Sequence, residues 1–250
     1  MSDSAVIVLF VAVTFAAAGF VKGVVGMGLP TVAMGVLSLV MAPAAAAAIL
    51  IVPSLVTNVW QFFVRRRFGA LLRRFASMMT AVCAGTALGI GVLTGASSSL
   101  ASAALGAILA LYGVIGLAAR RFTIAPAAEA WLSPVVGMIN GVVSGATGVF
   151  VVPAVPYLGC LGLAKEELIQ ALGLSFTVST VALAAALALT GKYQMVAAGS
   201  SVLAVLPALA GMFLGKLVRD KLRPDAFRRW FFMGLVILGV YMLGRALLPK

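Results

Sequence analysis

The stretch Gly19-Phe-Val-Lys-Gly-Val-Val-Gly-Met-Gly-Leu-Pro30 interrupts an apolar segment that runs from about residue 5 to about residue 41. A second stretch of the same kind, Gly137-Met-Ile-Asn-Gly-Val-Val-Ser-Gly-Ala-Thr-Gly148, lies within the apolar segment 130–163. Both segments are longer than one membrane crossing requires, and glycine at this density disfavours a continuous helix. We therefore expect both segments to be broken or re-entrant near the middle.

Composition places these segments in a membrane. Of the 250 residues, 63% are hydrophobic and 10% are charged, and the mean hydropathy is +1.18. A soluble domain usually carries about 25% charged residues, so this chain has too few polar residues to cover a water-exposed globule. Disorder, a fibrous repeat and an ordinary cytosolic enzyme are excluded, and we expect an all-α integral membrane protein.

Charge-free stretches set the number of hydrophobic segments. Residues 23–64 and 75–119 carry no charge, and each stretch is about twice as long as the roughly 20 residues of one spanning helix. We therefore expect about eight segments across the chain. They run approximately over residues 5–41, 44–64, 75–93, 100–119, 130–163, 168–190, 194–218 and 230–247.

The two glycine-rich stretches also resemble each other. Gly19, Gly23, Val24 and Val25 recur as Gly137, Gly141, Val142 and Val143 at an offset of 118. Ser54 can be set against Ser175, and Ala84-Gly85, Gly89 and Gly113-Val114 recur as Ala210-Gly211, Gly215 and Gly239-Val240 at an offset of 126. This order of features predicts two homologous halves, residues 1–122 and 123–250, within a single membrane domain.

Basic clusters between the segments account for the net charge of +12 and indicate orientation, because Lys and Arg in short loops stay in the cytoplasm. If every segment crosses once, ten basic residues lie inside and seven outside. If segments one and five return to the side they entered, the cluster at 216–229 and Lys165 join the clusters at 65–74 and 120–121, and the split becomes fourteen to three, with Lys22 within the membrane. We favour this second arrangement, which inverts one half relative to the other. Hairpins, broken spans and pairs of full crossings would all produce it, with Arg245 and Lys250 outside.

Chemistry is expected where the helices break. A break exposes helix N-termini, whose free N–H groups attract anions, and irregular backbone at membrane depth has to be enclosed by protein. Lys22 is the charged residue in the first break, where it either binds a substrate or extends its ammonium to the nearer interface. Asn140 takes the matching place in the second half. The remaining substrate-binding candidates are Gly23, Gly26, Gly28, Gly141, Ser144, Thr147, Gly148, Ser54, Asn58 and Ser175, with Thr57, Thr177 and Ser179 as further polar groups on the same segments.

Several chemistries are missing from the sequence. There is no histidine, the six acidic residues lie in the terminus or in loops, and no GxxxxGK[ST] nucleotide loop occurs. Cys83 and Cys160 stand alone in apolar stretches, which favours packing. We therefore expect neither a catalytic residue nor a metal or cofactor, and hence no enzyme. Coupling to an ion would have to use Lys22, a loop carboxylate such as Glu166 or Glu167, or a protonated substrate.

The second half carries a recognisable pattern: the glycine-rich stretch that begins at Gly137, Pro153 soon after it, and Gln170-Ala-Leu-Gly-Leu-Ser-Phe-Thr177. Together with its looser repetition in the first half, this pattern resembles the sulfite exporter TauE/SafE family of bacterial membrane permeases. The resemblance covers nearly the whole chain. It implies transport of sulfite, sulfonates such as sulfoacetate, or related organic anions across the bacterial inner membrane.

These observations predict a multi-pass secondary permease for a small anion that works by alternating access. The expected partners are the anionic substrate and membrane lipids, without nucleic acid, and homo-oligomerisation is left open. Two other interpretations are a passive anion channel and a non-transporting scaffold subunit.

Overall fold

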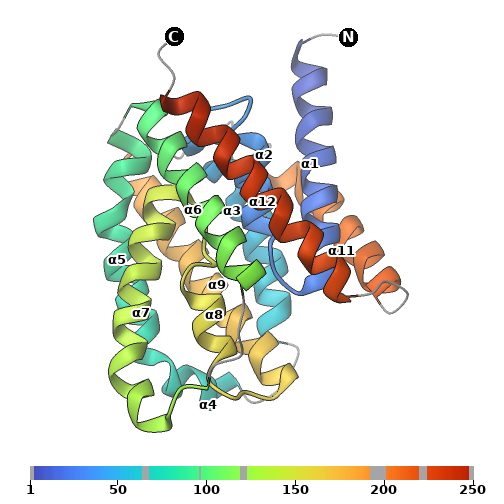
Figure 1. The fold of residues 1–250 in the computed structure, drawn as a ribbon. Helices are drawn as coiled ribbons and strands as arrows, with labels where there is room; N and C mark the ends of the chain where they lie inside the picture. The colour runs from blue at the N-terminus through green and yellow to red at the C-terminus, as the bar shows by residue number, and fades with distance from the viewer. Residues whose placement is uncertain are drawn as a thin grey trace.

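A computed structural model describes residues 3–63, 68–95, 97–118, 123–191, 201–219 and 224–247, and this part of the chain is helical with no strand. The basic clusters at 65–67 and 120–121, part of the cluster at 216–229, and Lys250 lie outside the described residues. The helices are α1 (Asp3–Val25), α2 (Leu29–Leu37), α3 (Pro43–Phe62), α4 (Phe68–Arg74), α5 (Ala76–Gly95), α6 (Ser98–Ala118), α7 (Pro126–Thr147), α8 (Ala154–Gly159), α9 (Lys165–Leu189), α11 (Val205–Arg219) and α12 (Pro224–Leu247) (Figure 1).

Seven helices in the described part of the chain are long and apolar enough to cross a membrane. They correspond to α1, α3, α5, α6, α9, α12 and the helical stretch Ser201–Arg219 that contains α11. The 22-residue α7 is not among them, and it contains Glu129, Pro134 and Asn140. The all-helical membrane architecture is confirmed, but the expected count of eight apolar segments is not.

Each of the two anomalous segments consists of a long helix followed by a short one. In the first, α1 ends at Val25 and the nine-residue α2 begins at Leu29; in the second, α7 ends at Thr147 and the six-residue α8 begins at Ala154. Each segment is thus broken near its middle, as predicted, although a re-entrant course is not confirmed, and the breaks come late in the glycine-rich stretches or just after them. Helix continues through Gly19, Gly23 and the whole of 137–147, and the non-helical residues come later, at 26–28 and 148–153.

These helical glycines are used for close packing between helices. A Cβ atom on Gly19 would lie 2.1 Å from the carbonyl oxygen of Ala208 on α11, and one on Gly141 would lie 2.3 Å from that of Val82 on α5. Small residues allow membrane helices to approach backbone to backbone, where dispersion contacts hold them together. The glycines therefore join α1 to α11 and α7 to α5, and they do not interrupt either helix.

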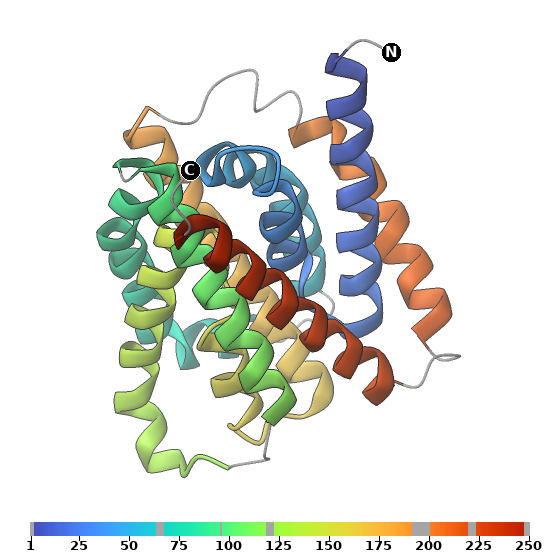
Figure 2. The same cartoon turned by 45° about the horizontal axis from the view of Figure 1, so that its top comes forward.

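The two most enclosed spans lie at the centre of the bundle. The apolar windows of α3 and α9 are 61% and 56% buried, against 22% to 44% for the other five candidate spans. Around this central pair, α1 packs on α11, α7 on α5, and α6 on α12 (Figures 1 and 2). In Figure 1, α1 and α3 run from the upper end of the molecule to the lower end, whereas α7 and α9 run upward.

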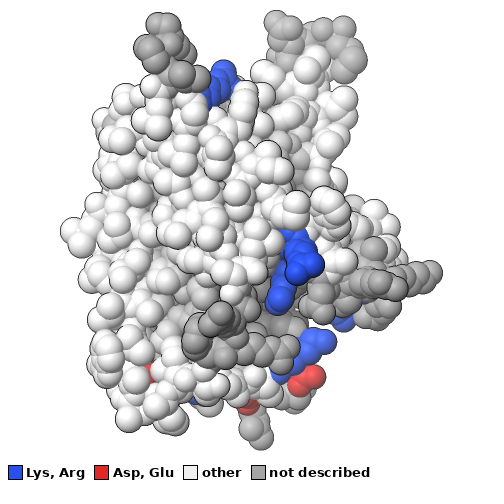
Figure 3. All heavy atoms as spheres, in the orientation of Figure 1, with Lys and Arg blue, Asp and Glu red and all other residues white. Residues whose placement is uncertain are grey.

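Charged side chains are concentrated at one end of the molecule. Most of the surface in Figure 3 is white, and most of the blue and red spheres lie in its lower part. There Arg74, at the end of α4, forms a bidentate ion pair with Glu129 near the start of α7, with N–O distances of 2.6 and 2.7 Å. The pKa of Arg74 is raised above its ordinary value, mainly because of this hydrogen bond to Glu129. This pair connects the two halves of the chain at that end.

Candidate functional site

Lys22 lies in the interior of the bundle. Its side chain is 4% exposed, and Nζ donates hydrogen bonds to Thr57 Oγ1, at 3.1 Å, and to Asn58 Oδ1. Both partners are on α3, one of the two central helices. The interpretation in which Lys22 extends toward the lipid headgroups is therefore wrong, because its ammonium position is fixed by two buried side chains.

A chain of hydrogen bonds continues from Lys22 into both central helices. Thr57 Oγ1 donates to the carbonyl oxygen of Pro53, at 2.8 Å, and Asn58 Nδ2 donates to Thr180 Oγ1 on α9, at 3.3 Å. Thr180 Oγ1 in turn donates to the carbonyl oxygen of Phe176, at 2.6 Å. We call Lys22, Thr57, Asn58 and Thr180 the Lys22 cluster; it joins α1, α3 and α9.

Gln61 ties the first helix break to the same place. Its Nε2 donates to the carbonyl oxygens of Gly26 and of Ile169, both at 3.1 Å. Gly26 is in the non-helical connection between α1 and α2, and Ile169 is on α9. One side chain of α3 therefore satisfies a carbonyl group that the end of α1 leaves free.

Three buried hydroxyl groups on the central helices have no hydrogen-bond partner among the described residues. They belong to Ser54 on α3 and to Ser175 and Ser179 on α9, and all three residues are fully buried. Ser54 precedes Asn58 by one helical turn, and Ser179 adjoins Thr180, so the three hydroxyls lie next to the Lys22 cluster along the chain. An unpartnered buried hydroxyl costs about 1–3 kcal/mol. A polar ligand between α3 and α9 would remove this cost.

Pro53 makes α3 irregular next to these groups. Proline has no N–H, so the carbonyl of Ile49 cannot form its usual bond within the helix. Ser201, just before α11, replaces that bond: its Oγ donates to Ile49 O at 2.7 Å and accepts from Val52 N at 3.1 Å. The irregular part of α3 is thus held by a residue of the second half.

The second break is organised differently from the first. With its nitrogen facing two carbonyls, the Asn140 amide lies 3.0 Å from Phe150 O and 3.1 Å from Val152 O. Thr147 Oγ1 accepts from Val149 N at 3.3 Å, and Gly148 ends α7 with φ of +71°, a conformation that favours glycine. Asn140, Thr147 and Gly148 therefore shape the connection from α7 to α8.

The predicted site residues fall into separate places. Lys22 and Asn58 are in contact, and Ser54 and Ser175 are buried on the two central helices. Gly26 and Gly28 form the first break, where Gly28 caps α2 with φ of +102°. Gly23 packs on α11 and Gly141 on α5. Ser144, on α7, also faces α5, with its Oγ 3.3 Å from Thr86 Oγ1.

Helix N-termini contribute less than the sequence predicts. Lys22 contacts side chains in the middle of α3 and no helix start. At the start of α2, Pro30 removes one of the N–H groups that an anion could use, and α8 has only six residues. The expectation of two converging N-termini as the main anion-binding element is therefore not supported, and side chains take that place.

Two residues beside Lys22, Thr180 and Gln61, are not among the site residues predicted from the sequence. A signal for Gln61 is present in the spacing, because Ser54, Thr57, Asn58 and Gln61 recur every three or four residues and so share one face of α3. Thr180 has no such signal, since α9 carries polar residues on more than one face. Its role depends on which face of α9 meets α3.

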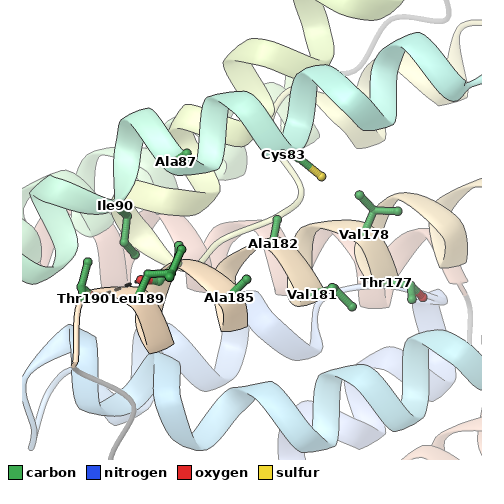
Figure 4. Close-up of a pocket in the computed structure, with 11 residues that line it drawn as sticks. Cys83, Ala87, Ile90, Thr177, Val178, Val181, Ala182, Ala185, Leu189 and Thr190 are labelled. Carbon is green, nitrogen blue, oxygen red and sulfur yellow. Dashed lines mark hydrogen bonds between the residues drawn. The ribbon is translucent and has the colours of Figure 1, made fainter.

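A separate groove of about 500 Å³ lies between α5 and α9 (Figure 4). Its lining is mainly Ala, Val, Ile and Leu, with Cys83, Thr177 and Thr190 as the polar exceptions. The hydroxyls of Thr177 and Thr190 donate to carbonyls of their own helix, those of Gly173 and Ala186. The groove offers no charge to an anion, so it does not replace the Lys22 cluster as a candidate site.

A bundle of apolar helices that encloses a lysine among uncharged polar groups defines a multi-pass membrane protein with a polar site at its core. The sequence pattern of the family described as Sulfite exporter TauE/SafE matches residues 10–242, nearly the whole chain. The chain therefore belongs to this family of membrane transporters for sulfite and related anions, as the resemblance of 137–177 predicts. Neither the curated proteins nor the solved structures contain a match to it.

Proposed function

We propose that this protein is a secondary transporter that moves a small oxyanion, sulfite or an organosulfonate, through a site between α1, α3 and α9. The observation that carries the proposal is Lys22: a buried amine held by two neutral side chains, with no carboxylate contacting it among the described residues. An ionisable group inside a membrane domain is a functional candidate by default. Its missing counter-charge is the charge of the substrate.

The neighbouring hydroxyls suit the chemistry of a sulfur oxyanion. Sulfite and sulfonates present three oxygen atoms, each of which accepts hydrogen bonds. Ser54, Ser175 and Ser179 can each donate one, since their hydroxyls have no partner among the described residues. Bonds to a charged acceptor are roughly twice as strong as bonds between neutral groups. One cation and three hydroxyl donors would bind such an anion in preference to a neutral solute.

Equivalent helix contacts support two homologous, inverted halves at 1–122 and 123–250. On α1, Gly19 faces Ala208 and Gly23 faces Met212 of α11. On α7, Gly137 faces Met78 and Gly141 faces Val82 of α5. The glycines of α1 and α7 are thus related by an offset of 118, and the facing residues of α5 and α11 by an offset of 130. In the same way, Gly113 faces Phe232 and Val236, and Gly239 faces Gly106 and Ala110, at an offset of 126. The sequence alone aligns Gly85 with Gly211 and Gly89 with Gly215, at an offset of 126. The contacts relate α5 to α11 at an offset of 130, four residues more.

Such symmetry provides a mechanism for alternating access. Inverted repeats let one half adopt the conformation of the other, which opens a central site to each side in turn. The site lies where α3 of the first half crosses α9 of the second, so motion between the halves would alter its access. Arg73, Lys165, Lys216 and Arg228 lie at helix ends toward the lower end of Figure 1, which would face the cytoplasm of a bacterial inner membrane.

Flux through reconstituted vesicles tests the proposal. Purified protein should catalyse saturable uptake of sulfite and of ethanesulfonate, with counterflow that a passive channel would not produce. Lys22→Met, which keeps the shape of the side chain but removes the charge, should reduce this flux at least tenfold. Lys165→Met is the matched control, because Lys165 is exposed at the start of α9. Wild-type flux in Lys22→Met would remove Lys22 from the site.

A further inference from the structure

The hydrogen bonds of Lys22 use two acceptors that have no hydrogen of their own to give it. Thr57 uses its hydroxyl hydrogen for Pro53 O, so its oxygen accepts from Lys22. Asn58 uses its nitrogen for Thr180 Oγ1, whose own hydrogen goes to Phe176 O, so the amide oxygen faces Lys22. Lys22 Nζ thus donates to two acceptors, as many as a neutral amine has N–H bonds. An ammonium has three.

Charges around α1 do not favour the ammonium either. The helices that pack on α1 are α2, α3, α11 and α12, and the first two carry no charged residue. The titratable residues of α11 and α12 are Lys216, Arg219, Asp225, Arg228, Arg229, Tyr241 and Arg245, with the side chain of Asp225 outside the described part. None of the described side chains on these four helices is a carboxylate.

Burial, neutral hydrogen-bond partners and the lack of a carboxylate among the described residues of these helices together disfavour a positive Lys22 in the empty site. An oxyanion reverses this balance, because it supplies both a counter-charge and an acceptor for a third N–H bond. We infer that Lys22 takes up one proton with each anion, so that this transporter carries a proton and an anion together. The inference rests on the proposed function and adds the coupling ion to it.

In this cycle Lys22 gains its proton on one side of the membrane and loses it on the other. The lone pair of Lys22 Nζ forms an N–H bond with a proton from water on the side to which the site is open, and the anion binds the resulting ammonium. When the site opens to the other side, the anion leaves, the N–H bond breaks and the proton enters the water there. A sulfonate with one negative charge therefore crosses with no net movement of charge.

Proton uptake on binding tests the inference directly. Ethanesulfonate is the probe, since it stays ionised throughout the accessible pH range and cannot supply or consume the proton itself. In weakly buffered detergent solution with a pH indicator, wild-type protein should take up about one proton for each anion bound. Lys22→Arg should bind the anion with no proton uptake, because a guanidinium is always charged.

The outcomes separate the two proposals. Ethanesulfonate binding without proton uptake in the wild type would overturn the proton coupling and leave the transport function standing. If neither sulfite nor ethanesulfonate binds, both proposals fall. In vesicles without a membrane potential, a gradient of one pH unit should accumulate ethanesulfonate about tenfold on the alkaline side, which is the side toward which protons flow. Accumulation that follows the membrane potential instead of the pH gradient would also refute the coupling.

Discussion

Replacing Ser175 by alanine should raise the stability of the empty protein while weakening anion binding. The side chain is fully buried, and its hydroxyl has no partner among the described residues. Removing an unpartnered hydroxyl eliminates a cost of about 1–3 kcal/mol. At about 2–4 °C per kcal/mol for a chain of this length, the unfolding midpoint should rise by several degrees.

The matched control is Ser201→Ala, which removes the same atom from an equally buried serine. Here Oγ bonds two backbone groups, Ile49 O and Val52 N, and its loss leaves both without that partner. Stability should therefore fall by about 1–3 kcal/mol. The two serine-to-alanine changes are thus expected to shift the unfolding midpoint in opposite directions.

Thermal unfolding in one detergent, with and without sulfite, measures both effects. A hydrogen bond to a charged group contributes about 1.5–3 kcal/mol, so Ser175→Ala should weaken sulfite binding by roughly 10- to 100-fold. Ser201→Ala should retain most of the stabilisation that sulfite gives. If Ser175→Ala instead lowers the midpoint as much as Ser201→Ala and binds sulfite normally, Ser175 is a structural residue and the site is misplaced.

Two further predictions concern packing and topology. Gly141→Ala should prevent α7 from docking on α5 and so reduce the yield of folded protein in size-exclusion chromatography, because its Cβ would lie 2.3 Å from Val82 O; Gly91→Ala, with no atom within 4 Å, should leave the yield unchanged. In a cysteine-free background, single cysteines at 165 and 216 should both react from the cytoplasmic side with a membrane-impermeant reagent, and labelling from opposite sides would contradict the inverted arrangement.

The buried lysine could be predicted from the sequence, but the places of the helix breaks could not. Lys22 is a lone charge in an apolar segment, and such a charge has few stable positions in a membrane. Glycine, in contrast, serves two purposes that look alike in a sequence. Gly141 lets two helices touch, whereas Gly148 adopts a positive φ where a helix ends. Only the helix opposite each glycine distinguishes these uses.

The hydroxyl groups show the same limit. Ser144 and Ser175 are both serines in apolar helices, and both are predicted from the sequence to bind substrate. Ser144 Oγ lies within hydrogen-bond distance of Gly141 O and of Thr86 Oγ1, while Ser175 Oγ has no partner in the described part of the chain. This difference depends on which helix face meets a polar neighbour. That information comes from tertiary packing, which residue spacing does not contain.

Lys22 and Asn140 occupy equivalent positions in the proposed halves, and their difference bears on how many anions the protein binds. Asn140 is engaged by Phe150 O and Val152 O in the break that follows its own helix, whereas Lys22 contacts Thr57 and Asn58 on the central helix α3. Of this pair, only Lys22 therefore brings an ionisable group to the centre. Because α3 and α9 pack against each other, the serines of both halves can serve that one group. Under the proposed function, we therefore expect a scaffold with this one lysine to bind one anion for each chain and to expose the same lysine in both directions of opening.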